Sequence, residues 1–233
     1  MDYLLSSRAL LAFTTKFAGK TIYMRKHLYI VACASLLIGS NLLAGCNNNK
    51  NEGNDVQAPT AVNDQPLAVS RENQPVHDAF TGLLDDYDSL HGALVNWDTA
   101  AANKAAAKLA ASSKAFPFDQ MQSDSSLLPT VRSFVGQVEQ EANNIVKTNN
   151  IETKRRAFAV LSNNIYDLAR TIQYGGSPLY KVTCPMAFNG NEQADWVSRK
   201  NEVLNPFLGT SHPKYKKGML HCGEVSDSMN YRK

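Results

Sequence analysis

The sequence is poor in the features that usually identify an enzyme or a nucleic-acid-binding protein. It contains no Gly-x-Ser-x-Gly, His-Glu-x-x-His or Gly-x-x-x-x-Gly-Lys motif, and no Cys-x-x-Cys-His haem-attachment motif. An excess of one charge is also missing, because residues 46–233 carry 19 basic and 20 acidic side chains. A basic face is needed to displace counterions from phosphates. We therefore expect a protein that is not an enzyme and has no nucleic-acid partner.

Long apolar runs are absent except near the N-terminus, where the chain has the three parts of a bacterial lipoprotein signal. A basic stretch at residues 25–27 precedes an apolar run over residues 28–38, and residues 42–46 read Leu-Leu-Ala-Gly-Cys, the lipobox pattern. The apolar run is too short and too interrupted for a transmembrane helix. We predict a lipoprotein signal peptide over residues 1–45, whose translation could start at Met24, and a covalent lipid on Cys46.

Residues 46–75 are polar and contain three prolines and no apolar stretch that could form a core. This composition predicts a flexible tether that holds a folded domain away from a membrane. The lipid anchor makes the membrane a partner. Asn47 is not the aspartate that often retains lipoproteins at the inner membrane, so we expect the outer membrane or another periplasm-facing membrane surface.

Between residues 76 and 174 apolar residues recur at three- and four-residue steps, which predicts four amphipathic helices. Asp98 is a candidate N-cap for the second helix, and Pro129 marks the start of the third. Asn149-x-x-Glu152 resembles a capping box for the fourth. Short links favour antiparallel neighbours, so we predict an all-α fold, an up-down four-helix bundle. The predicted core positions are Phe80, Leu83, Leu84, Tyr87, Leu90, Leu94, Ala105, Leu109, Val131, Phe134, Val135, Val138, Ala142, Ile145, Phe158, Leu161, Ile165, Leu168 and Ile172.

The last 59 residues, 175–233, lose this periodicity and are punctuated by proline and glycine. Only residues 193–200 suggest a helical turn. We predict a small irregular C-terminal lobe, rich in cysteine and methionine, packed on the bundle. An unstructured run of this length is uncommon in a compact domain unless it is functional or cross-linked, so something should hold this lobe in place.

The lobe contains two short segments that combine soft metal ligands, Cys184-Pro185-Met186 and Met219-Leu220-His221-Cys222. Thiolate and thioether sulfur select soft ions such as Cu(I) and Ag(I). Cys184, Met186, Met219 and Cys222 are therefore candidate ligands for Cu(I) or Ag(I). Zinc prefers cysteine and histidine without methionine, so a less favoured zinc site would combine both cysteines with His212 and His221.

A disulfide explains the same two cysteines without a metal. Exported proteins fold in oxidising compartments, and a bond between Cys184 and Cys222 would contribute roughly 3–4 kcal/mol by the chain-entropy estimate. The methionines would then be core residues and the histidines surface or capping residues. Spacing alone does not separate a structural disulfide from a metal site.

Several segments together resemble a family described only as a domain of unknown function. That family occurs in bacterial lipoproteins and at the C-terminus of periplasmic adaptor subunits of copper/silver efflux pumps. The resemblance covers about residues 77–225. The segments that carry it are Arg155-x-Ala157-Phe158-x-x-Leu161-Ser162, Cys184-Pro185-Met186-Ala187-Phe188, Ala194-Asp195-Trp196-Val197-Ser198, Asn205-Pro206-Phe207-x-Gly209 and Met219-Leu220-x-Cys222-Gly223.

The resemblance implies heavy-metal binding, with copper or silver as the cargo and a periplasmic efflux adaptor as a partner. It implies that Cys184, Met186, Met219 and Cys222 are the ligands. Trp196, Asn205 and Pro206 would be scaffold residues that orient the loops. The segment 210–217 is longer than the usual link in this family, so the resemblance gives His212 no role. The disulfide-stapled interaction lipoprotein stays open as the alternative, as does a site that is a disulfide when empty and a dithiolate when loaded.

Overall fold

The structure, a computed structural model, describes residues 72–122 and 124–232. The predicted signal peptide, the lipid on Cys46 and nearly all of the predicted tether lie outside these residues. The tether prediction runs slightly too far, because the first helix already begins at Gln74. None of the helices in the described part of the chain is long and apolar enough to cross a membrane.

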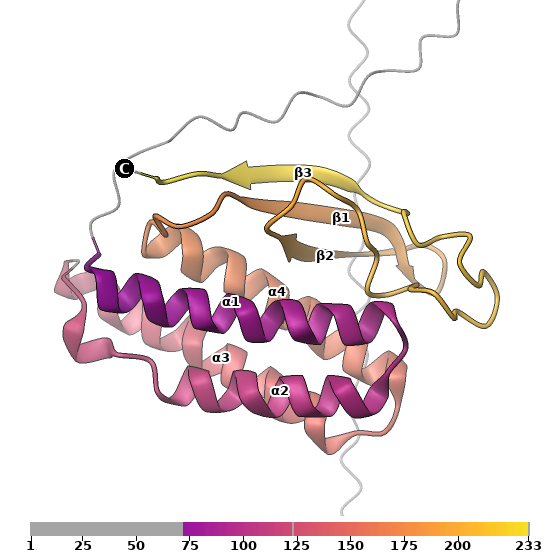
Figure 1. Ribbon diagram of the computed structural model, residues 1–233, viewed down its shortest axis with the longest axis horizontal. Helices are drawn as coiled ribbons and strands as arrows, with labels where there is room; N and C mark the ends of the chain where they lie inside the picture. Colours follow the sequence, from indigo (N-terminus) through magenta and orange to yellow (C-terminus); the bar gives the residue numbers. More distant parts are fainter. Residues whose placement is uncertain (1–71, 123, 233) are drawn as a thin grey trace, which may run out of the picture. The chain divides into compact units, whose positions relative to one another are not determined.

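The first part of the described chain forms four α-helices that run up and down beside one another (Figure 1). α1 spans Gln74–Val95, α2 Thr99–Lys114, α3 Leu128–Lys147 and α4 Ile151–Thr171, with the short 3-10 helices η1 (Phe118–Gln120) and η2 (Ser125–Leu127) between α2 and α3. Each helix packs against the next in sequence. The four predicted helices are therefore present, in the predicted order.

Local capping explains where these helices begin. The Asp98 carboxylate accepts a hydrogen bond from the Ala101 backbone N–H at 2.8 Å, as its N-cap position predicts. α4 starts one residue later than the capping-box pattern indicates, because Asn150 caps it and accepts from the Thr153 N–H at 2.9 Å. Of the predicted core positions all are buried except Phe134, which is half-buried.

The all-α prediction is wrong, because the C-terminal segment contains a sheet. β1 (Leu179–Phe188) lies between β2 (Glu192–Ser198) and β3 (Glu224–Met229), and both neighbours are antiparallel to it. The fold is thus four helices with a three-stranded antiparallel sheet. β1 alternates between buried side chains at Tyr180, Val182 and Cys184 and half-buried ones at Lys181 and Thr183. This period of two identifies a strand, which a search for helical spacing misses. The predicted helical turn at residues 193–200 is mostly β2.

The sheet lies across α1 and α4, with α2 and α3 on the far side of these helices (Figure 1). The buried Tyr87 hydroxyl of α1 joins the layers, since it accepts from the Val197 N–H of β2 at 2.9 Å and lies 2.8 Å from the Ser162 hydroxyl of α4. Ion pairs at the edges link α4 to the outer strands, Arg156 to Glu192 at 2.7 Å and Arg170 to Asp227 at 2.6 Å. Helices and sheet share one hydrophobic core.

Candidate functional site

The structure brings Cys184 and Cys222 together, although 38 residues separate them in the chain. Their Sγ atoms lie 3.2 Å apart and both are free thiols. The pairing of β1 with β3 explains this, because Thr183 lies opposite Glu224, which places Cys184 beside the residues that lead into β3. Cys184 is buried and Cys222 is half-buried, so the pair is reached from the Cys222 side.

A tight turn carries Cys222, and Asn205 holds that turn. The turn closes with a hydrogen bond of 3.1 Å from the Cys222 N–H to the Met219 carbonyl. The Asn205 side-chain amide donates to the Cys222 carbonyl at 2.7 Å, and the Asn205 N–H donates to the Leu220 carbonyl at 2.8 Å. Asn205 is fully buried, so these bonds form away from competing water and fix the turn firmly.

The predicted scaffold residues Trp196, Asn205 and Pro206 make the following contacts. The side-chain oxygen of Asn205 accepts from the Phe207 and Leu208 N–H groups at 2.8 and 2.9 Å. The Pro206 carbonyl accepts from Arg155 Nε at 2.8 Å. Trp196 is fully buried, and a Cβ atom added to Gly223 would lie 2.8 Å from its Cη2 atom. The residue after Cys222 therefore needs to be glycine for the loop to rest on the indole.

The environment of the thiol pair favours its protonated state. Burial, and then the hydrogen bond with the Cys184 thiol, raise the pKa of Cys222 to about 12. At neutral pH Cys222 is therefore a thiol, and an ion that binds it as thiolate must displace its proton.

The predicted methionine ligands lie on the same two segments, at different distances along them. Met219 is half-buried, packs against the core and sits in the turn that ends at Cys222. Met186 is also half-buried, but the register of β1 shifts between Cys184 and Phe188. Regular alternation therefore does not place Met186 on the Cys184 face of the strand.

The two predicted histidine ligands each hold a loop of backbone. His221 is exposed, and its Nδ1 donates to the Val203 carbonyl at 2.8 Å. His212 Nδ1 accepts from the Lys214 and Tyr215 N–H groups, both at 3.2 Å. Across residues 72–122 and 124–232 no three His, Cys, Asp or Glu side chains group closely enough to hold a metal ion. A zinc site of both cysteines and both histidines is not assembled among them.

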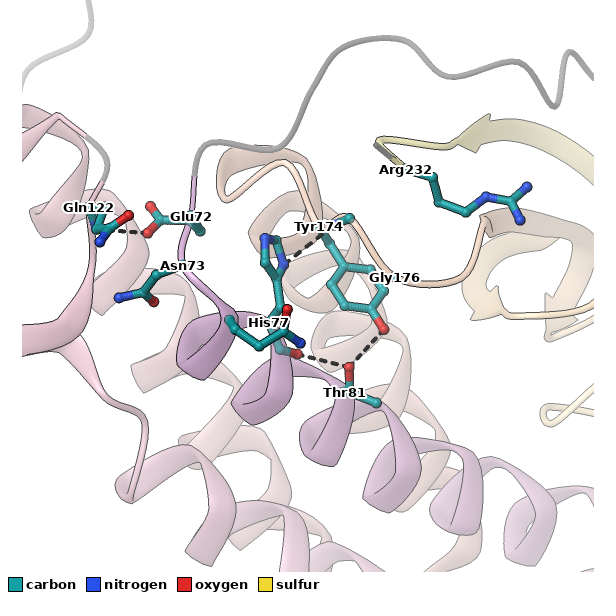
Figure 2. A pocket seen from close by; sticks show the side chains of 10 residues that line it. Glu72, Asn73, His77, Thr81, Gln122, Tyr174, Gly176 and Arg232 are labelled. Atoms are coloured by element: carbon teal, nitrogen blue, oxygen red, sulfur yellow. Dashed lines mark hydrogen bonds between the residues drawn. The ribbon is translucent and has the colours of Figure 1, made fainter.

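A cavity of about 580 Å³ lies beside the start of α1 (Figure 2). Its polar groups bond mainly to one another: the Tyr174 hydroxyl lies 2.9 Å from the Thr81 hydroxyl, and His77 Nδ1 accepts from the Gly175 N–H at 3.3 Å. Glu72 accepts from the Gln122 N–H at 2.9 Å through one carboxylate oxygen. This network ties α1 to the end of α4, and none of the sequence-predicted site residues lines it.

Comparison with known proteins identifies one family. Residues 83–175 match the model of a family described as protein of unknown function, DUF3347. The match supports the resemblance to a domain-of-unknown-function family and covers the helices from within α1 to the end of α4. It ends before β1, so it includes neither Cys184 nor Cys222. No curated protein and no solved structure gives a significant match.

The matched region contains one functional candidate that sequence reasoning treated only as part of a motif. Arg155 is 3% exposed, and its guanidinium lies 3.8 Å above the Trp97 ring. It donates to the carbonyls of Pro206 and Leu94 and so connects α4 to the loop that holds the thiol turn. Arginine in a helix is usually exposed, as the adjacent Arg156 partly is, and the sequence carries no signal that separates the two.

Proposed function

We propose that this chain is an exported, lipid-anchored protein that binds Cu(I) or Ag(I) through Cys184 and Cys222. The observation that carries the proposal is the 3.2 Å separation of two free thiols from distant parts of the chain. Soft ions prefer sulfur donors, and two thiolates satisfy the two-coordinate geometry that Cu(I) accepts. The half-buried Cys222 gives an ion access to the buried Cys184.

Loading this site would exchange protons for metal. Both S–H bonds would lose their protons, and the two thiolate sulfurs would bind one Cu(I), which leaves a complex of net charge −1. The raised pKa of Cys222 makes this exchange sensitive to pH. Met219 lies in the same turn as Cys222, three residues before it, and would serve as a third ligand. Met186, two residues after Cys184 on β1 and beside the register shift of that strand, would be a further candidate ligand.

The lipobox and the polar residues after it support a role at a membrane surface in the periplasm or at the outer membrane. In that place a soft-metal site would sequester Cu(I) or Ag(I), or deliver it to a periplasmic efflux adaptor. Delivery requires an exposed ligand that a partner can attack, and Cys222 is the more accessible of the two thiols.

A disulfide-stapled structural or interaction lipoprotein is the second candidate, and the same short Sγ–Sγ distance favours it. Formation of the bond would bring the sulfurs to about 2.05 Å, and two protons and two electrons would pass to an oxidant such as the thiol-oxidising system of the periplasm. The bond would tie the loop before β3 to β1 without any metal.

A competition titration separates the two candidates. The chain from residue 46 onward, with Cys46→Ser so that two thiols remain, would be titrated anaerobically with Cu(I) against a chromophoric chelator. We expect one tightly bound Cu(I), lost in Cys184→Ser and in Cys222→Ser, and bound more weakly in Met219→Ala. Met121→Ala removes a thioether elsewhere in the fold and is the matched control. Two results together would establish the second candidate: the reduced protein binds no Cu(I), and the protein isolated from cells contains the disulfide.

A further inference from the structure

A second site lies apart from the thiol pair. A cavity of about 320 Å³ opens between the α1–α2 turn, the first turn of α4, the end of β1 and the loop that follows Asn205. Three aromatic side chains, Trp97, Phe188 and Phe207, form half of its apolar lining, and neither cysteine lines it. Arg155 and His212 contribute the polar groups that matter for what it can bind.

Arg155 brings a positive charge to this cavity without a counter-ion. Its Nε donates to the Pro206 carbonyl at 2.8 Å and its Nη2 to the Leu94 carbonyl at 3.0 Å. In the described part of the chain no carboxylate forms an ion pair with it, and Nη1 has no hydrogen-bond partner. The charge of a residue that is 97% buried is costly to leave without an anion, and neutral carbonyls compensate only part of it.

His212 supplies a second unused donor. Its Nδ1 already accepts two backbone hydrogen bonds, so the neutral ring carries its proton on Nε2. Desolvation first, and then the charges of Arg155 and Lys214, lower the pKa of His212, which keeps the ring neutral. The ring stacks on Tyr215 with centroids 4.8 Å apart and meets Trp97 edge-on at 5.9 Å. Within residues 72–122 and 124–232, nothing accepts the Nε2–H.

We propose that this cavity binds a small monocarboxylate with an apolar body. The carboxylate would neutralise Arg155 and accept hydrogen bonds from Arg155 Nη1 and His212 Nε2, while the aromatic walls cover the rest of the ligand. One buried cation matches a monoanion better than a phosphate dianion. The N-terminus of α4 adds to the attraction, since Ile151 and Glu152 of its first turn line the cavity. The Glu152 carboxylate does not compete for Arg155, because Arg156 holds it at 3.2 Å.

Benzoate is a suitable probe, and benzamide is its uncharged counterpart of nearly the same shape. The indole N–H resonances of the Cys46→Ser chain would be followed by ¹⁵N NMR during each titration. We expect benzoate to shift the Trp97 signal saturably and to leave Trp196, which does not line the cavity, unchanged. Benzamide and inorganic phosphate should leave both signals in place. A Trp97 signal that does not respond to benzoate, or responds equally to benzamide or phosphate, overturns the proposal.

His212→Asn is the most informative variant, because an asparagine oxygen can still accept from the Lys214 and Tyr215 N–H groups while the Nε2–H donor is gone. A hydrogen bond to a charged group changes affinity by roughly tenfold or more, and we expect that loss for benzoate. His221→Asn, which alters a histidine outside this cavity, should bind benzoate as the parent chain does. Arg155→Gln should abolish binding. If that variant does not fold, the comparison of the two histidine variants decides, and equal affinities would refute the site.

Discussion

The Asn205 side-chain amide reaches across 17 residues of sequence to donate a hydrogen bond to the Cys222 carbonyl at 2.7 Å. The same side chain accepts from two backbone N–H groups of its own loop, at Phe207 and Leu208. One buried residue therefore fixes both the loop after β2 and the turn that presents the Cys222 thiol. The position of Cys222 relative to Cys184 therefore depends on this residue.

Asn205→Ala should destabilise the fold and loosen the thiol pair. The substitution leaves two buried N–H groups and the Cys222 carbonyl without partners, which should lower the free energy of unfolding by about 2–4 kcal/mol. Cu(I) affinity should fall with it. Asn205→Ser keeps a hydroxyl oxygen that can accept from the N–H groups of its own loop and loses the donor to Cys222, so it should cost less stability. Denaturant unfolding of both variants measures this, and equal losses would show that the bonds from the Phe207 and Leu208 N–H groups matter little.

Gly209 should tolerate no side chain. Its φ of +59° is left-handed, and an added Cβ would lie 2.5 Å from the Val95 carbonyl oxygen and 2.7 Å from Trp97 Nε1. Gly209→Ala should therefore lower stability by about 2–4 kcal/mol, from backbone strain and from displacement of Trp97. Gly92→Ala is the control, because nothing lies within 4 Å of its Cβ position in α1. Gly92→Ala should raise stability by about 0.5–1 kcal/mol. Thermal unfolding of the two variants tests the predicted loss and the predicted gain.

Tyr87→Phe should weaken the attachment of the sheet to the helices. The hydroxyl accepts from the buried Val197 N–H and bonds to Ser162. Its removal therefore leaves the Val197 N–H in the core without an acceptor. We expect a loss of about 1–3 kcal/mol in the free energy of unfolding. Tyr215→Phe removes a hydroxyl whose loss breaks no hydrogen bond in the described structure and should change stability by less than about 0.5 kcal/mol. Similar effects of the two changes would argue against a role for Tyr87 in joining the layers.

The helices could be predicted because their signals are local. Positions such as Phe80, Leu83 and Tyr87 recur at helical spacing and are all fully buried, and Asp98 caps α2 through its immediate neighbours. The sheet could not be predicted in this way. Four of the six residues of β3 are polar and only Met229 is buried, which an edge strand allows, and so it has no alternation of apolar residues to detect. A bulge after Cys184 also interrupts the alternation of β1.

The candidate site was predictable in its chemistry and not in its geometry. The cysteines stand out by residue type, but their proximity depends on a strand register that places Thr183 opposite Glu224. His212 looks like a ligand in the sequence, and only the structure shows that its Nδ1 holds the backbone at Lys214 and Tyr215. Arg155 illustrates the same limit, because its burial follows from the packing of three distant segments.

The raised pKa of Cys222 predicts a stability that falls in alkali. A thiol in the unfolded chain ionises near its ordinary pKa of about 8.5, whereas the folded state holds the Cys222 proton to higher pH. Above about pH 8.5 the unfolded state therefore binds fewer protons than the folded state, and the free energy of unfolding decreases as pH rises towards the folded pKa.

The loss between pH 7 and pH 10 should be about 1 kcal/mol under reducing conditions, less than the shift alone implies, because Cys222 is half-buried and water screens its charge. Lysines and tyrosines also titrate in this range, so the measurement is the difference between the parent chain and Cys222→Ser in urea unfolding at each pH. That difference should shrink as pH rises. A difference that stays constant from pH 7 to pH 10 would mean that the Cys184 thiol and burial do not hold the Cys222 proton, and a difference that grows would mean that the empty site is already a thiolate.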